Sequence, residues 1–415
     1  MANAFKNQTL IIGLFIRLFE NLMVLSKHVD RQVGEKEFAS TKNTGGTVYV
    51  KRPVRAKSTA GAAITEGQLT DIEQATVPVA VDTYRKTAFT LTQEQRALND
   101  VQIMELMKPF AIELVQDVEN AIALAGANYF PNAIGTPGST PATFLEVGSA
   151  FTRLFGLGVP ADDINAFYNP QAGLYIADAL KASPNQDIAK TAIQKAFIKR
   201  VSNMDLFNCQ SLTSHTVGVN TGTPLVNGAS QDTTYLLSKD TQTQSLITKG
   251  WTNDQTGILL KGDTFTIAGV YEINANSRVA NANLQKFVVT ADANSGSSTG
   301  PATLTISPPI ITSGPYQTVS AAPADEAVIT VFGTAATAYA QNLAFQKNAI
   351  TLAFARLPEM EPGSGVVSKR VVHDGISMNY SYGSDITNMS TIYRFDLLFG
   401  VKVQNPMFGI RTYGE

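Results

Sequence analysis

The sequence predicts an α+β protein of several domains, because three kinds of segment follow one another along the chain. A basic, extended N-terminal part gives way to one long helical pattern at residue 93. A stretch rich in Thr, Asn and Gly later interrupts a second region that reads as helical. A chain of 415 residues exceeds the size of one hydrophobic core, so two or three domains are expected.

Charge and cysteine content argue against several functional classes. The 34 acidic and 32 basic residues leave a net charge of −2, which disfavours nonspecific nucleic-acid binding through bulk charge. The single cysteine, Cys209, allows no internal disulfide and suits a reducing compartment. As a catalytic thiol it would have only His215 as a candidate base, and a small buried hydrophobe is the better interpretation.

The first 35 residues are predicted to form an arm that contains an apolar helix. The run from Leu10 to Ile16 is uninterrupted, but charged residues after it end the run well short of the roughly 20 residues that a membrane span needs. Polar residues fall close to one stripe at helical spacing, which leaves a wide apolar face. Either this helix packs within its own domain, or Leu14, Phe15 and Leu18 dock on a neighbouring subunit or a scaffold.

Residues 36–90 have no helical period and are predicted to form two long strands joined by a flexible loop. Residues 47–51 and 77–81 alternate, and they flank a tip of small residues at 58–63. The first limb is basic and the return limb acidic, so the limbs can match charges across a subunit boundary. Charged, solvated edge strands would show the same pattern. The candidate interface residues are Lys51, Arg52, Arg55, Lys57, Glu66, Asp71 and Glu73.

A long helix is predicted from residue 93 to about residue 128. Thr92 and Gln95 have the spacing of a capping box, and apolar residues then recur every three or four positions as far as Gly126. At 1.5 Å per residue such a helix is a rod of roughly 50 Å. Pro109 is expected to kink or interrupt it.

Shorter elements follow. Helices are predicted over 143–157, 169–182 and 185–201, the second with Asn169 as its N-cap and Pro170 at its first position. Six short β runs between residues 216 and 333 predict a small barrel or sandwich. A helix predicted over 334–357 makes this β domain an insertion into a helical region, and alternation over 393–403 predicts a long strand with one buried face. The six runs are 258–260, 264–267, 270–273, 287–289, 303–306 and 328–331.

No motif predicts a catalytic residue, a cofactor or a metal. Gly296–Gly300 fits G-x-S-x-G around Ser298, but a proline and a strand follow it, whereas a nucleophile elbow needs a helix. Gly156–Ala161 matches G-x-G-x-x-A, but it follows a helix and its proline removes a backbone donor. The three histidines are scattered, without zinc-type spacing. We expect no enzymatic activity, and a hydrolase built around Ser298 is the remote alternative.

The order of these parts resembles the major capsid proteins of tailed phages, with the Hong Kong 97-type fold. The inserted β segment narrows the resemblance to the branch typified by the coat protein of phage P-22. Residues 261–270 are similar to the basic-Gly-Asp-x-β-x-β-Ala-Gly-Val stretch of that family's insertion, and Phe167–Gln171 is a second similarity. Within the first stretch we expect a turn and then a strand with a bend or bulge. The motif residues are Lys261, Gly262, Asp263 and Gly269.

The resemblance implies a plan of domains and a function. The chain would be a major capsid protein that self-assembles into the icosahedral shell around a double-stranded DNA genome, found in the virion and assembled in the host cytoplasm. The implied domains are an N-terminal arm (1–35), an extended loop (36–90), a peripheral domain with a spine helix (91–134), the first part of an axial domain (135–215), an inserted β barrel (216–333), an axial return helix (334–362) and closing strands (363–415).

The implied partners are copies of the chain itself in hexamers and pentamers, a scaffolding protein during assembly and a portal protein at one vertex. Packaged DNA would be contacted weakly if at all, and no membrane is expected. An encapsulin-type compartment shell is the alternative within the same fold, against which the sizeable insertion and the long arm argue. Reversing the charges of Arg52 and Arg55 is expected to impair shell assembly and leave the monomer folded.

Overall fold

The structure, a computed structural model, describes residues 15–20, 22–31, 46–56, 61, 74–98, 103–181, 200–361 and 365–415. The chain divides into two compact units, and each is built from three separate stretches of sequence. Unit 1 comprises Met1–Val50, Pro78–Ile122 and Ile350–Lys402, and unit 2 comprises Lys51–Val77, Ala123–Ala349 and Val403–Glu415.

Unit 1 contains a sheet in which one long strand is central. β20 pairs antiparallel with β19 on one side and with β3 on the other, so that Tyr393 lies opposite both Tyr382 and Phe89. Alternate residues of β20 from 393 to 399 are buried, which confirms the predicted strand and its buried face. The strands are β3 (Thr83–Thr92), β17 (Ile350–Phe354), β18 (Val366–His373), β19 (Ile376–Asp385) and β20 (Ser390–Val403).

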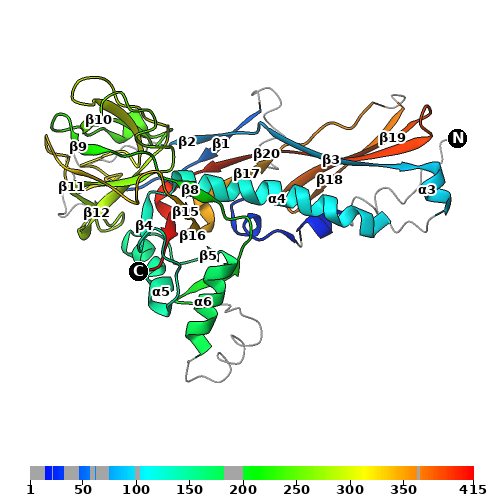
Figure 1. The fold of residues 1–415 in the computed structure, drawn as a ribbon, viewed down its shortest axis with the longest axis horizontal. Helices are drawn as coiled ribbons and strands as arrows, with labels where there is room; N and C mark the ends of the chain where they lie inside the picture. Colours follow the sequence, from blue (N-terminus) through cyan, green and yellow to red (C-terminus); the bar gives the residue numbers. More distant parts are fainter. Residues whose placement is uncertain are drawn as a thin grey trace. The chain divides into compact units, whose positions relative to one another are not determined.

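The predicted long helix is present as α4 (Ile103–Tyr129), which runs along this sheet (Figure 1). The start of the predicted range forms a short helix, α3 (Gln93–Leu98), and residues 99–102 between the two lie outside the described part. The capping box is confirmed, because Gln95 N donates to Thr92 Oγ1 at 3.2 Å and Thr92 N donates to Gln95 Oε1 at 3.1 Å. α4 continues through Pro109, so the proline does not interrupt it.

The predicted strands of the extended loop are also present. β1 (Thr47–Lys51) and β2 (Thr76–Ala80) form a two-stranded sheet, and both show alternating burial. Of the predicted tip, 58–63, only residue 61 belongs to the described residues. Residues 15–20 of the arm are helical, and a 3₁₀ turn follows at Ser26–His28.

In unit 2 a six-stranded sheet of order β4-β21-β16-β5-β7-β6 packs against two helices. α5 (Phe144–Gly156) starts with a capping box at Thr143, and α6 (Pro170–Lys181) starts at Asn169, whose Oδ1 accepts from Ala172 N at 2.7 Å. The helix predicted over 185–201 falls mostly outside the described residues. The strands are β4 (Asn132–Ile134), β5 (Ile164–Tyr168), β6 (Arg200–Val201), β7 (Met204–Asn208), β16 (Asn342–Gln346) and β21 (Gly409–Thr412).

The inserted segment of unit 2 is a six-stranded antiparallel barrel, as predicted. Its order is β14-β11-β12-β13-β10-β9, and an antiparallel bridge between Leu225 and Val328 closes the two edges of the sheet. The runs predicted over 264–267 and 270–273 form one bulged strand, the run over 258–260 forms only an isolated bridge, and β9 and β10 were not predicted. The strands are β9 (Gly222–Val226), β10 (Gln244–Trp251), β11 (Thr264–Ile273), β12 (Ala280–Val289), β13 (Ala302–Ser307) and β14 (Ile329–Val331).

The helix predicted over 334–357 is wrong. This stretch forms β15 (Ala338–Ala340), which pairs with β8 (Ser214–Thr216), and then β16 and β17. All five residues of β16 and all five of β17 are buried. A strand buried on both faces has a continuous apolar run without alternation, so its pattern cannot be told from that of a buried helix. The expected axial return helix is therefore made of strands.

Candidate functional site

The Lys261–Asp263 motif is a structural joint of unit 2. Asp263 is buried, its Oδ2 accepts from Leu260 N at 2.7 Å and from Gly218 N at 2.9 Å, and its Oδ1 lies 2.7 Å from His215 Nε2. One carboxylate thus satisfies two backbone donors and joins the barrel to the segment before it. Sequence reasoning missed the His215–Asp263 pair, because 48 residues separate its members.

The same motif contacts the end of α4. Gly262 has φ +102°, and a Cβ there would come within 2.9 Å of Asn128 Oδ1 and 3.0 Å of His215 Cε1, so only glycine fits without strain. Lys261 Nζ lies 4.8 Å from the ring centre of Tyr129. The expected turn is therefore present, and its side chains fasten the barrel to α4.

The expected bulge at Gly269 is confirmed. The register of β11 against β12 shifts between Thr266 and Tyr271, and Gly269 has φ +80°. A residue with positive φ in the middle of a strand is typical of a bulge, which bends the strand sharply. In this barrel the bend falls within its longest pair of strands.

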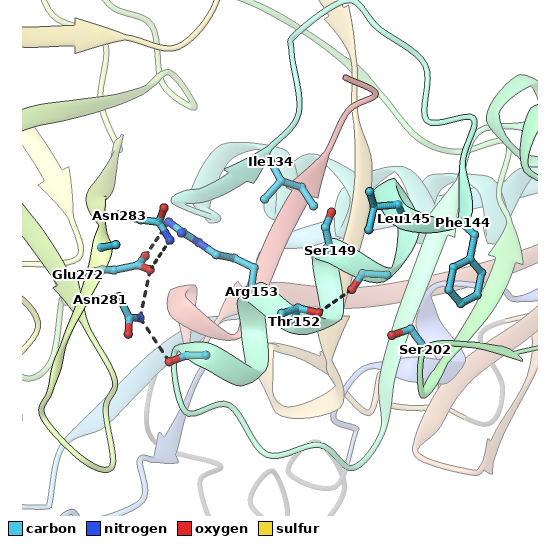
Figure 2. A pocket seen from close by; sticks show the side chains of 13 residues that line it. Ile134, Phe144, Leu145, Ser149, Thr152, Arg153, Ser202, Glu272, Asn281 and Asn283 are labelled. Atoms are coloured by element: carbon cyan, nitrogen blue, oxygen red, sulfur yellow. Dashed lines mark hydrogen bonds and ion pairs between the residues drawn. The ribbon is translucent and has the colours of Figure 1, made fainter.

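A second joint links α5 to the barrel, beside a cavity of about 710 Å³. Figure 2 shows Arg153 reaching from α5 toward Glu272 of β11, with Nη2 2.6 Å from Oε2 and side chains 14% and 1% exposed. Asn281 and Asn283 donate to Glu272 Oε1 at 3.1 and 3.3 Å. Burial raises the pKa of Glu272 and lowers the pKa of Arg153, so desolvation opposes both charges and offsets part of the attraction between them.

Lys286 of β12 adds a third charged group near this joint. Its Nζ donates to Ala133 O at 2.5 Å and lies 4.0 Å from the ring centre of Phe332. Burial, together with the positive charges of Arg153 and Arg411, lowers the pKa of Lys286 to about 7. The joint is therefore a cluster of partly buried charges that groups of the same chain hold in place.

The patterns that resemble catalytic motifs are used for structure. Ser298 and Thr299 have positive φ in the turn between β12 and β13, so no helix follows the serine. The backbone of the G-x-G-x-x-A stretch is bound by the barrel, because Asn274 Nδ2 donates to Gly156 O at 2.8 Å and Asn276 Nδ2 donates to Gly158 O at 3.3 Å. Among the described residues, no three His, Cys, Asp or Glu side chains gather as they would around a metal.

The basic residues of the extended loop are placed differently from one another. Arg52 is only 5% exposed, and its guanidinium donates to the carbonyls of Gln404 and Lys239. Burial lowers the pKa of Arg52 to about 10. Lys51 is exposed. Charge reversal at Arg52 would put a carboxylate against two carbonyls, so we expect it to disturb unit 2 itself, and the predicted test of assembly is better made at Lys51.

The remaining interface candidates are divided between the arm and the loop. Phe15 is buried in unit 1, where its ring stacks on Phe395 with centroids 3.9 Å apart, and Leu18 is half-buried. This supports packing of the arm helix within its own domain. A docking role for Leu18 stays a prediction. Leu14, Lys57, Glu66, Asp71 and Glu73 lie outside the described residues.

No helix among the residues that the structure describes is long and apolar enough to cross a membrane. Of the apolar run at 10–16, only residues 15 and 16 belong to the described residues.

Comparison with known proteins gives a concordant result. A family model described as "P22 coat protein - gene protein 5" matches residues 1–414. A major capsid protein of Acyrthosiphon pisum secondary endosymbiont phage 1 is 25% identical over 428 residues, which cover 100% of both proteins. A solved chain of Mycobacterium phage Che8 has a TM-score of 0.45 and 12% identity, covering 94% of this chain and 90% of its own. The CUS-3 coat protein I-domain is 28% identical over 27% of this chain and 96% of its own, with a TM-score of 0.20.

The observed elements follow the order that the resemblance implied, except that strands replace the expected return helix. An arm, a two-stranded extended loop, a long helix, a mixed sheet with an inserted barrel and a set of closing strands follow one another. The Hong Kong 97-type capsid fold with an inserted β barrel is therefore confirmed. Because the family model spans almost the whole chain, this protein belongs to the P22 coat-protein family of phage capsid proteins.

Proposed function

We propose that this phage major capsid protein self-assembles, through hexamers and pentamers, into the icosahedral shell that encloses the double-stranded DNA genome of a tailed phage. The observation that carries the proposal is the match of the family model to residues 1–414. A protein of this family is part of the virion capsid, where many copies form one shell. Repeated weak contacts between copies give such a shell its stability.

We further propose that the chain has no catalytic activity and that assembly takes place in the host cytoplasm, with a scaffolding protein and a portal protein as partners. The turn at Ser298 supports the first part, because a serine there lacks the strand-turn-helix setting of a nucleophile. A net charge of −2 supports weak contact with packaged DNA. The domain boundaries from the sequence remain our proposal, with strands in place of the helix over 334–362.

Electron microscopy and size-exclusion chromatography of the chain, expressed alone and with its genomic neighbours, test the proposal. We expect capsomer rings or closed shells, and a monomer under every condition would contradict it. Analysis of the particle content separates the two shell functions, because an encapsulin-type compartment would hold a cargo enzyme and a capsid would package DNA.

The charge reversal Lys51→Glu tests the interface proposal. Lys51 is exposed on β1, so its substitution leaves the contacts of the chain itself in place. We expect fewer closed shells and an unchanged unfolding temperature. Lys108→Glu, at an exposed position of α4 outside the arm and the loop, is the control, and equal shell yields from both variants would argue against an interface at Lys51.

A further inference from the structure

The barrel of unit 2 contacts residues 52–56 of the extended loop, which directly follow β1, and this gives the insertion a role beyond its own fold. We propose that Tyr235, Arg278 and Tyr316, together called the clamp, position the root of the extended loop at residues 52–56 for contact with the next copy of the chain. The proposal rests on the shell function proposed above. It concerns positioning residues, which act through the loop.

Two stacked aromatic rings form the first half of the clamp. Tyr235 begins α8 (Tyr235–Ser238), and its ring lies parallel to that of Tyr316 with centroids 3.5 Å apart and an interplanar angle of 1°. The Tyr316 hydroxyl accepts from Arg55 N at 3.1 Å. Stacking restricts the rotation of the Tyr316 ring, so the N–H of Arg55 is bonded to a hydroxyl group that can move little.

A hairpin turn of the barrel forms the second half. Arg278 Nη2 donates to Ala56 O at 2.8 Å. The turn that carries Arg278 is itself fixed, because Arg278 N donates to Asn274 O at 2.8 Å and the Asn274 side chain is tied to the end of α5. The N–H of Arg55 and the carbonyl of Ala56 thus bind to two different parts of the barrel. Together the two hydrogen bonds fix the position and the direction of the loop backbone at these residues.

Both limbs of the extended loop are tied to one further segment of the barrel. Arg52 on the outgoing limb donates to the carbonyl of Lys239, and its Nε and Nη1 each lie 3.1 Å from the carboxamide oxygen that Gln242 presents to them. On the return limb, Thr76 N donates to Asp240 Oδ1 at 3.4 Å. A buried guanidinium bonded to carbonyl groups costs desolvation energy, so its presence at the root favours a positioning role over simple stabilisation.

The clamp would affect shell assembly because the same loop contact recurs at every copy of the chain. Every copy in a shell would present its loop in the same way, so an error in loop direction is repeated at each contact. Loss of the clamp should therefore reduce the yield and uniformity of closed shells far more than it lowers the stability of the monomer.

The double variant Tyr316→Phe/Arg278→Gln tests this, because it removes one acceptor and one donor and keeps the stacked rings. Tyr271→Phe is the matched control, since this barrel tyrosine is 42% exposed. In the unassembled chain, hydrogen exchange at the amide of Arg55 should rise about five- to tenfold in the double variant, which is the effect of one lost hydrogen bond. The unfolding temperature should match that of the control.

Electron microscopy of assembly reactions gives the second measurement. We expect normal shells from the unmodified chain and from Tyr271→Phe, and aberrant or few shells from the double variant. Unchanged exchange at Arg55, or faster exchange with normal shells, would overturn the positioning role alone. A failure of the unmodified chain to form shells would instead overturn the proposed shell function, and with it this inference.

Discussion

Replacing Glu119 by Gln should release the N-terminal arm from α4 within unit 1. Glu119 of α4 is only 2% exposed, and its carboxylate faces the backbone of the arm. Oε1 accepts from Val24 N at 3.2 Å, from Ser26 N at 3.0 Å and from Ser26 Oγ at 2.5 Å, and Oε2 accepts from Leu25 N at 2.6 Å. One side chain thus satisfies three successive backbone donors of the arm.

The magnitude follows from these contacts. Glutamine keeps one acceptor, but its NH₂ group would face the buried Leu25 N–H, and an unsatisfied buried donor costs about 1–3 kcal/mol. Loss of charge weakens the other bonds by about 1 kcal/mol in total. The neutral side chain no longer has a charge to bury, which offsets part of the sum. We expect about 2 kcal/mol, or roughly a thirtyfold rise in the open state of the arm.

Hydrogen exchange at the amides of Leu25 and Ser26 measures this opening, and limited proteolysis of the arm gives an independent readout. Glu113→Gln is the control, because it makes the same chemical change on the same helix at an exposed position. We expect protection to fall about thirtyfold in Glu119→Gln and to stay constant in the control. Protection within threefold of the unmodified chain would refute the idea that this carboxylate fastens the arm.

Three further predictions concern unit 2. Asp263→Ala leaves the backbone donors of Leu260 and Gly218 unpaired and should lower the unfolding temperature by roughly 5 °C or more in calorimetry; an unchanged transition would contradict its role as a joint. Gly262→Ala forces a side chain into φ +102° and should cost about 1–3 kcal/mol in urea unfolding, whereas Gly269→Ala, in open space at φ +80°, should cost less. The pKa of Lys286 is lowered from 10.5 to about 7, so between these values the unfolded chain binds a proton that the folded chain does not. Stability should therefore rise with pH across this window, by at most about 1.4 kcal/mol per pH unit, and Lys286→Met should flatten the rise in urea titrations at pH 7, 8 and 9.

Features determined by near neighbours in the chain could be predicted from the sequence. The helix starts at Thr92 and Asn169 depend on side chains and amides three residues apart, and both are present. The long strand β20 shows its alternation within one segment, and the bulge at Gly269 follows from the conformational freedom of one residue. In each case the donor, the acceptor or the pattern lies within the segment itself.

Features determined by distant partners could not be predicted in this way. β16 is buried because it pairs with β5 and β21, and Ala344 lies opposite both Ala166 and Ile410. Nothing within residues 334–357 indicates that two other strands flank it, so its continuous apolar run is equally compatible with a helix. The stacked Tyr235 and Tyr316, 81 positions apart, likewise leave no local pattern.

The contact of Glu119 with the arm did leave a signal in the sequence. Glu119 follows Val118 and comes one turn after Val115 and one before Ile122, so it lies on the apolar face of the predicted helix. A carboxylate on such a face needs donors when it is buried, and the arm supplies them. An acidic residue within the apolar stripe of a helix therefore predicts a tertiary contact.

In the extended loop, the side of the strand to which a charged residue points decides whether it is buried or exposed. Val48, Val50 and Arg52 are buried, and Tyr49 and Lys51 between them are exposed. Neighbouring side chains of an extended segment point to opposite sides, so Arg52 shares the side of two valines and Lys51 does not. The basic limb therefore contains two kinds of cation. Arg52 is used in contacts of its own chain, whereas Lys51 is exposed and is the better position at which to test a contact with a neighbouring copy.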